Sequence, residues 1–598
     1  MVTRHSALPD EIPGQVQVLI SGGGPSGLFL ALDLAARGIA TLVIEPRDAV
    51  DPTRPRAKTT NARTMTHLRR LGLADALRAA APLAVDYAQD VIFCTGIAGP
   101  EAHELRRFRQ AFQLVPGRYD PQPECGQQVP QPVLEEVLRE AAAGSPLITL
   151  LTGWTVEAVD MSDGDGAAAV AGRTPVAVGV SDASGRTRSV TAGFVIGADG
   201  GSSAVRRRLG LRLEGGSAAL SNISILFRSR ELGSAITLDP AVQYWVVGAD
   251  TAGMVGPMDL DDTWWAIVQG VDPQTAVSSG DAAAMVRSLV GTEAVNIDVE
   301  VVATDPWTAR MLLAPEYSRG SIFLVGDAAH LNPPWGGHGF NTCIGDAANL
   351  AWKLAAALQG WAGPGLLDSY GRERRPVAER TIRDAAANGE ALAYHFADPL
   401  LVAAGPDGEA ARQAAFEALA VKQSEFDSLG LVLGYAYGGS PVVVPDGSPV
   451  PAEDPTRYVP AASPGALLPH VWLGDGTSVY SRLGQGFTLL ADAGTLDGVP
   501  AEHVFAPVLD AAARQGIPVT VAAVGPSDDG TPPSELWGAA AVLVRPDQHV
   551  AWRGSSAEAA AAALAVAAGW TAPRAPAPRG AEPQDQHERK TRVSAVIP

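Results

Sequence analysis

An acidic residue, a glycine-rich loop and a helix follow one another between residues 326 and 354, reading GDAAHLNPPWGGHGFNTCIGDAANLAWKL. A short apolar strand leads into Gly326 and Asp327, and apolar residues recur at helical spacing after the loop. The start of a helix offers unpaired N–H groups and a partial positive charge. This order of residues predicts a site for a polar ligand, with Asp327 and the helix start in contact with it.

A second glycine-rich turn lies near the N-terminus, where Gly22, Gly24 and Gly27 form G-x-G-x-x-G. An apolar strand precedes it, and a helix and a second strand ending in Glu45 follow it. Such glycines allow a tight turn and close approach of the backbone to a pyrophosphate, and the acid can bind a ribose. The pattern predicts dinucleotide binding, with a glycine-rich surface turn as the alternative. The acid disfavours a 2′-phosphate, which leaves FAD or NAD.

Three further polar residues stand next to predicted elements. Arg56 precedes an amphipathic helix and could neutralise phosphates, whereas Gln131 begins another helix and is placed to reach a ligand. Asp199 follows a buried apolar strand, in the run GADGG. By itself, Gln131 would be an ordinary polar residue of a first helical turn.

A strand-rich segment between about residues 215 and 300 has the pattern of an inserted sheet. Aromatic residues concentrate there, including Tyr244, Trp245, Trp264 and Trp265. They could form a hydrophobic core, or one or two of them could line a pocket for an aromatic substrate. The pattern does not decide between these roles.

Composition narrows the class of protein. A chain of 598 residues is too long for one core, and its net charge of -20 argues against nucleic acid or an anionic membrane as partner. Three widely spaced cysteines without C-x-x-C argue against a metal site or a disulfide framework and fit a reducing compartment. No signal core or membrane-spanning run is evident. We expect a cytoplasmic protein.

Three motifs in order, GGGPSG, GADGGSSAVRRRLG and GDAAHLNPP, are followed by ERRPVA. Together they resemble the single-component FAD-dependent aromatic hydroxylases, the class of p-hydroxybenzoate hydroxylase. The later segments SLGLVLGYAYGGSPVV, SPGALLPHVWLGDGTSVYSRLGQGFTLL and LVRPDQHVAWR look closest to the phenol and 2,4-dichlorophenol 6-monooxygenase branch. The resemblance implies an α/β fold with a Rossmann-type FAD-binding domain, an inserted β-sheet substrate domain and a C-terminal thioredoxin-like domain.

The expected domain bounds combine this resemblance with the strand and helix patterns. In that class the last domain serves structure or dimerisation, so a homo-oligomer is expected, and the missing C-x-x-C leaves it without dithiol chemistry. The expected segments are 14–82, 105–190 and 300–400 for FAD binding; 83–104 and 191–299 for the substrate sheet; 401–460 for a helical connector and linker; 461–571 for the thioredoxin-like domain; and 572–598 for a disordered tail.

The resemblance implies hydroxylation of a phenolic or polycyclic aromatic substrate with NAD(P)H and O2, through a flavin C4a-hydroperoxide. NADH and NADPH are not distinguished, because no second dinucleotide motif is present. Epoxidation or Baeyer–Villiger oxidation would use the same flavin chemistry and stays open. A non-catalytic, flavin-bound sequestering protein is a further alternative.

Site residues follow by carrying the family motifs onto this sequence. The residues expected to bind FAD are Gly22, Gly24, Ser26, Gly27, Glu45, Arg56, Gln131, Asp199, Asp327, Pro334, Gly339, Phe340 and Asn341. The residues expected around the substrate are Pro334, Trp335, Tyr244 and Trp245. No general base can be assigned, and the candidates are His338, Tyr244 and Asp259.

Overall fold

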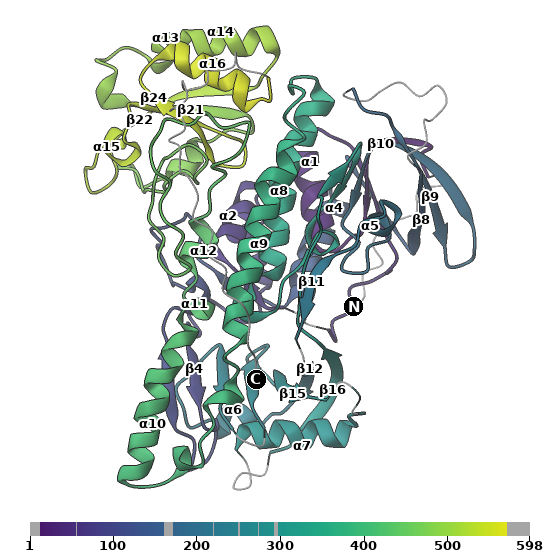
Figure 1. The fold of residues 1–598 in the computed structure, drawn as a ribbon, viewed down its shortest axis with the longest axis vertical. Helices are drawn as coiled ribbons and strands as arrows, with labels where there is room; N and C mark the ends of the chain where they lie inside the picture. Colours follow the sequence, from purple (N-terminus) through teal and green to yellow (C-terminus); the bar gives the residue numbers. More distant parts are fainter. Residues whose placement is uncertain are drawn as a thin grey trace, which may run out of the picture.

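The computed structural model describes residues 12–54, 57–160, 172–218, 221–248, 251–272, 274, 276–291 and 297–570. Two long helices, α8 (Gly339–Gln359) and α9 (Ser369–Gly389), run through its centre (Figure 1). A mostly parallel sheet flanks them, a seven-stranded sheet lies at one end of the molecule, and a smaller α/β domain lies at the other. The predicted α/β fold with three structural parts is confirmed.

The parallel sheet is built on the strand that enters the first glycine turn. Residues Val18, Leu19 and Ile20 of its central strand are fully buried, as expected for a parallel strand covered on both faces. Helices α1 (Pro25–Ala36), α4 (Gln131–Ala143) and α8 pack together beside it. Its strands, in spatial order, are β18 (Ser318–Arg319), β19 (Ile322–Leu324), β10 (Thr187–Gly197), β1 (Gln15–Ser21), β2 (Thr41–Glu45) and β7 (Ile148–Thr152), extended from β10 by β9 (Val176–Asp182) and β8 (Trp154–Asp160).

The seven-stranded sheet is antiparallel except where β13 pairs with β4. Helix α7 (Ser279–Val290) packs on one face, and the short helix α11 (Gln423–Phe426) lies against the other. The strands, in spatial order, are β16 (Glu300–Trp307), β12 (Ser221–Arg228), β15 (Thr263–Val271), β14 (Gly253–Pro257), β13 (Gln243–Val246), β4 (Val91–Cys94) and β5 (Glu104–Phe108).

Strand pairing corrects three of the expected domain bounds. Strand β10 belongs to the parallel sheet, although the expected bounds place residues from 191 onward in the substrate sheet. Strands β5 and β16 belong to the seven-stranded sheet, although the expected bounds place residues from 105 and from 300 in the FAD-binding domain. Strands β10 and β16 pair with strands distant in sequence, which leaves no local sequence signal, whereas β5 pairs with β4, the strand that precedes it in the chain.

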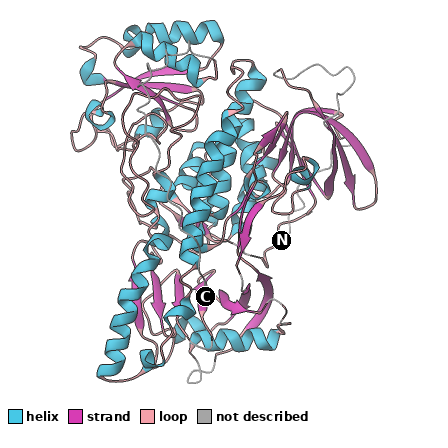
Figure 2. Ribbon diagram, in the orientation of Figure 1, coloured by secondary structure: helices cyan, strands magenta, loops and turns pink. Residues whose placement is uncertain are grey.

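The C-terminal domain is a four-stranded mixed sheet with helices packed on it, in agreement with the predicted thioredoxin-like fold (Figure 2). Its core includes Trp352 of α8, so the domain shares apolar packing with the rest of the chain. The expected disordered tail lies outside the described residues. The elements are β22 (Val519–Val524), β21 (Phe487–Asp492), β23 (Ala541–Val544) and β24 (Val550–Gly554), with α13 (Ala501–Val504), α14 (Ala506–Gln515), α15 (Pro533–Trp537) and α16 (Ala557–Ala567).

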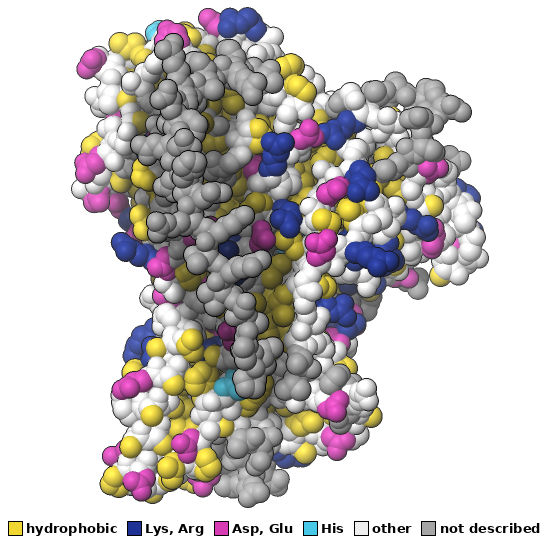
Figure 3. Space-filling view, viewed as in Figure 1, with side chains coloured by type: hydrophobic (Ala, Val, Ile, Leu, Met, Phe, Trp, Pro, Cys, Tyr) yellow, Lys and Arg dark blue, Asp and Glu magenta, His cyan; other side chains and the backbone are white. Residues whose placement is uncertain are grey.

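The surface carries both signs of charge. Figure 3 shows basic and acidic side chains interspersed over the face in view. In the part of the chain that the structure describes, no helix combines the length and the apolar character needed to cross a bilayer.

Candidate active site

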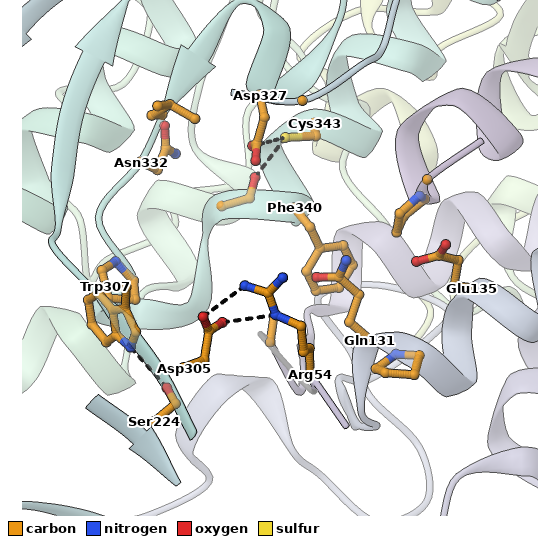
Figure 4. Close-up of a pocket in the computed structure, with 18 of the residues that line it drawn as sticks. Arg54, Gln131, Glu135, Ser224, Asp305, Trp307, Asp327, Asn332, Phe340 and Cys343 are labelled. Atoms are coloured by element: carbon orange, nitrogen blue, oxygen red, sulfur yellow. Dashed lines mark hydrogen bonds and ion pairs between the residues drawn. The ribbon is translucent and has the colours of Figure 1, made fainter. Parts of the chain in front are cut away.

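One cavity of about 960 Å³ lies between the glycine turn of the parallel sheet and the seven-stranded sheet (Figure 4). Gly22, Gly24 and Glu45 line one end of it, and the indoles of Trp245 and Trp265 belong to the other. This volume is at the upper end of the range for small-molecule sites. The cavity can therefore take a large cofactor beside a second molecule.

The first glycine turn leaves no room for a side chain at Gly22 or at Gly27. Gly22 has a φ of +108°, and its N–H donates to Ile44 O at 2.8 Å. A Cβ on Gly22 would stand 2.3 Å from Ala198 O, and one on Gly27 would stand 2.0 Å from Gly22 O. Gly24 and Ser26 line the cavity, whereas Gly27 packs beneath the turn. The turn thus brings backbone N–H groups and the start of α1 up to the cavity.

Glu45 is buried at the end of β2 and lines the cavity. Its carboxylate accepts hydrogen bonds from Gly23 N–H at 2.7 Å and from Arg47 Nε at 2.7 Å. Arg47 also pairs with Glu135 at 2.6 Å, so the guanidinium bridges two acids. Gln131, at the first turn of α4, lines the same end of the cavity. These contacts fix the Glu45 carboxylate beside the glycine turn, where a ribose hydroxyl could donate to it.

Two more carboxylates border the cavity. One oxygen of Asp199 accepts the N–H groups of Ala204 at 2.7 Å and Val205 at 3.2 Å. Its other oxygen is buried without a hydrogen-bond partner among the described residues. Asp327 exposes its carboxylate on the cavity wall, with Cys343 Sγ at 3.5 Å (Figure 4). A buried acceptor without a partner is costly, so Asp199 is set to receive a donor from a bound ligand.

The start of α8 faces the cavity with its first turn. Thr342 N–H donates to His338 O at 2.9 Å, so the N–H groups of Gly339, Phe340 and Asn341 come before the first bond of the helix. Gly339 and Phe340 line the cavity. The Asn341 side chain instead donates to Thr59 O at 2.9 Å and fixes the neighbouring chain. The positive end of a 21-residue helix therefore points at the cavity.

A buried carboxylate that the sequence did not single out fixes the Gly326 turn. Asp346 accepts the Gly326 N–H at 3.2 Å and pairs with His330 Nε2 at 2.7 Å and with Arg374 Nε at 2.8 Å. Burial alone would raise the pKa of Asp346, but Arg374 and His330 hold it below its usual value. Arg374 lies in the ERRPVA run and His330 in the GDAAHLNPP run, so the sequence motifs contain both partners of this carboxylate.

The substrate end of the cavity is apolar and aromatic. Trp245 lies on β13 and Trp265 on β15, the strands on either side of β14. The ring centroid of Phe426 of α11 lies 6.4 Å from that of Trp245. Tyr244 projects to the opposite face because side chains alternate along a strand. There it is buried among apolar residues, and its hydroxyl donates to Asp239 O at 2.9 Å. The pocket and catalytic roles expected for Tyr244 are therefore wrong.

The other two candidate bases, His338 and Asp259, do not line the cavity either. His338 is buried behind the loop and does not line the cavity, and burial lowers its pKa to about 4. Asp259 accepts the N–H groups of Asp261 and Thr263 in a turn outside the cavity. Neither residue is placed to remove a proton from a molecule in the cavity.

Pro334 and Trp335 both line the cavity, on the short turn η3 (Trp335–Gly337). The Trp335 indole packs on α9, where a Cβ on Gly389 would stand 2.4 Å from the ring. Arg56 lies outside the described residues, but Arg54 borders the cavity and pairs with Asp305 at 2.8 Å (Figure 4). The segment that contains Arg54 and the turn that contains Trp335 are far apart in the sequence, and both border the cavity.

Comparisons with known proteins agree with this geometry. The FAD binding domain family matches residues 15–385, and the family described as aromatic-ring hydroxylase, C-terminal, matches residues 461–573. An FAD-dependent monooxygenase, apdD, of Emericella nidulans is 32% identical, with 92% of this chain and 89% of that protein covered. The 2,4-dichlorophenol 6-monooxygenase of Cupriavidus pinatubonensis is 33% identical, with 93% and 96% covered. The crystal structure of the flavin-dependent monooxygenase PieE with FAD and substrate has a TM-score of 0.80 and 31% identity, with 94% and 99% covered.

Fold, cavity and comparisons together define a flavoprotein monooxygenase. The chain belongs to the FAD-dependent aromatic hydroxylase family, in the branch that includes 2,4-dichlorophenol 6-monooxygenase. FAD is its cofactor, as the sequence predicted. The residues fit that group, because the glycine turn, the free acceptor of Asp199 and the start of α8 all border one cavity.

Proposed function

We propose that this enzyme hydroxylates a phenolic or polycyclic aromatic compound with NAD(P)H and O2. The observation that carries the proposal is the continuity of one cavity from the glycine turn to the tryptophan-lined sheet. A cofactor at one end and an aromatic ring at the other would share one continuous space. The relatives support the same class, since their names include 2,4-dichlorophenol 6-monooxygenase and phenol 2-monooxygenase.

Bound FAD would accept a hydride from NAD(P)H and activate O2 for transfer of one oxygen atom. The protein would hold it by the glycine turn and by Glu45, Asp199 and Asp327. The N–H groups at the start of α8 would lie against its ring system and stabilise negative charge there, because they are preorganised and belong to the positive end of the helix. Removal of one such donor costs about 3–4 kcal/mol of barrier in a comparable oxyanion site.

The substrate end has two tasks in this proposal. Trp245 and Trp265 provide flat apolar surfaces against which an aromatic ring can pack. Phe426, only 1% exposed, and the rings around it keep water from that end. Exclusion of water matters because the activated oxygen would otherwise leave as hydrogen peroxide before it reached the ring. We also propose that the chain assembles as a homo-oligomer, which light scattering of the purified enzyme tests.

Consumption of NADH and of NADPH by the purified yellow protein tests the proposal. Substituted phenols and polycyclic quinols should each be added, with hydrogen peroxide measured in parallel. A suitable aromatic should accelerate consumption without equivalent peroxide. Consumption that no aromatic changes, or that yields only peroxide with all of them, would count against hydroxylation. Oxygen inserted into a ketone or an isolated double bond would point instead to Baeyer–Villiger or epoxidase activity.

A further inference from the structure

A lysine ammonium is buried in the wall of the cavity. Lys58 precedes the short strand β3 (Thr59–Thr60), and the residue is only 3% exposed. Its Nζ donates to Val242 O at 2.8 Å and to Pro257 O at 3.2 Å. Both acceptors are neutral carbonyls: Val242 immediately precedes β13, and Pro257 ends β14. Trp245 and Trp265 of the same sheet line the cavity. An ammonium has three N–H donors, so these two bonds leave one for a further acceptor.

The sheet is shaped to admit this side chain. A Cβ on Gly256 would stand 2.9 Å from Lys58 Nζ and 2.7 Å from Val242 O. Glycine at this position in β14 therefore leaves space for the ammonium between the two carbonyls. Lys58 is also held along its backbone, because its carbonyl accepts the Val129 N–H at 2.7 Å. The position of Nζ follows from these contacts and needs no bound molecule.

No acid neutralises Lys58 among the described residues. Its Nζ forms no described ion pair, and burial is the sole cause that lowers its pKa, to about 7. Two acids on the cavity wall already have cations of their own: Asp305 pairs with Arg54, and Glu425 pairs with Lys422. The charged form of Lys58 is thus an unmatched cation beside an aromatic-lined space. A buried cation of this kind gains most from an anionic partner.

We propose that Lys58 takes the proton of the substrate's phenolic hydroxyl and holds the resulting phenolate. The proposal rests on the hydroxylase function and specifies its substrate as a phenol that binds in ionised form. In this step the neutral amine of Lys58 accepts the proton: the phenol O–H bond breaks, an N–H bond forms, and the electron pair stays on oxygen. The ammonium then donates that N–H to the phenolate, while its other two donors stay on Val242 O and Pro257 O. The ring becomes electron-rich and therefore ready for oxygenation.

Optical titration of 4-nitrophenol bound to the oxidised, FAD-loaded enzyme tests the step without turnover. The probe is coloured only as phenolate, and NAD(P)H is left out. With the unchanged enzyme, the bound probe should ionise at lower pH than the free probe. Lys58→Met, which keeps the length of the side chain and removes the amine, should raise the apparent pKa of the bound probe by at least one unit, a tenfold change in ionisation. Tyr244→Phe, on the opposite face of the sheet, should leave it unchanged.

Equal ionisation of the bound probe in the unchanged enzyme and in Lys58→Met would overturn the proposal. If the variant does not fold, the unchanged enzyme still tests the proposal. Binding of the probe only as the neutral phenol, or no binding of the phenolate at any pH, would overturn it. These outcomes are separate from the turnover assay. An enzyme that ionises the probe but hydroxylates no aromatic would refute the proposed function while Lys58 still bound the phenolate.

Discussion

A buried carboxylate joins the C-terminal domain to the two central helices, and its removal gives a sharp prediction. Glu373 of α9 accepts two hydrogen bonds from Arg545, at 2.6 and 2.8 Å, and one from Lys353 Nζ of α8 at 2.6 Å. Asn349 Nδ2 donates to it as well, at 2.7 Å. Glu373, Lys353 and Arg545 have fully buried side chains. Burial alone would raise the pKa of Glu373, yet Arg545 and Lys353 hold it well below its usual value.

Glu373→Gln keeps the shape of the side chain and removes the charge. Lys353 then loses its anion, and the new amide N–H groups face the donors of Arg545. Among the described residues, Arg545 keeps one acid as an ion-pair partner, Asp547, at 2.6 Å. Loss of one partner of a buried ion pair costs about 3–5 kcal/mol, because the remaining charges stay buried without compensation. With a urea dependence of roughly 3 kcal/mol per molar, the unfolding midpoint should fall by about 1–2 M.

Urea unfolding of the FAD-loaded enzyme, followed by far-ultraviolet circular dichroism and by flavin fluorescence, measures this cost. Glu379→Gln is the matched control on the same helix. Its carboxylate is 57% exposed and stands 3.5 Å from Arg375, so its loss should cost less than about 1 kcal/mol. Equal midpoints for the two variants, or a cost below about 1 kcal/mol for Glu373→Gln, would refute the reasoning.

Four further variants test the placement of site residues. Gly27→Ala puts a Cβ 2.0 Å from Gly22 O and should abolish FAD retention, measured by flavin absorbance after gel filtration; a fully loaded variant would contradict the turn geometry. Asp327→Ala should weaken FAD retention by the same assay, and unchanged retention would remove its role. Tyr244→Phe should leave kcat within about twofold, because the hydroxyl faces away from the cavity. His338→Asn should leave the pH profile of kcat/KM between pH 5 and 9 unchanged, since burial already keeps the ring neutral there; a lost limb would restore His338 as a base.

Most residues at the cofactor end of the cavity can be predicted from the sequence, because each of their motifs lies within a short stretch of chain. The spacing of Gly22, Gly24 and Gly27 and the position of Glu45 follow from one strand–turn–helix unit, and the structure places Gly22, Gly24 and Glu45 on the cavity wall. Asp327 precedes its helix in the same way. The residues of such a unit are close together in the sequence, so a short motif is enough to predict their function.

The residues at the substrate end of the cavity cannot be predicted from the sequence in this way. Tyr244 and Trp245 are adjacent and both aromatic, and only the register of β13 against β4 decides which of them meets the cavity. Phe426 comes from a segment that the sequence indicated only as a connector. No sequence motif indicates the burial of Lys58, because it depends on carbonyls 184 and 199 residues away. Contacts between segments far apart in the sequence determine where these side chains lie, so no local sequence pattern predicts their positions.

Transfer of oxygen from labelled dioxygen is the most direct test of the central claim. The FAD-loaded enzyme, NAD(P)H and a phenolic substrate that accelerates its consumption should be combined under an atmosphere of heavy-isotope O2, and the product examined by mass spectrometry. The account predicts one labelled oxygen atom on the aromatic ring of the product. An unchanged aromatic with all of the consumed O2 recovered as hydrogen peroxide, for every phenol that stimulates the enzyme, would contradict it.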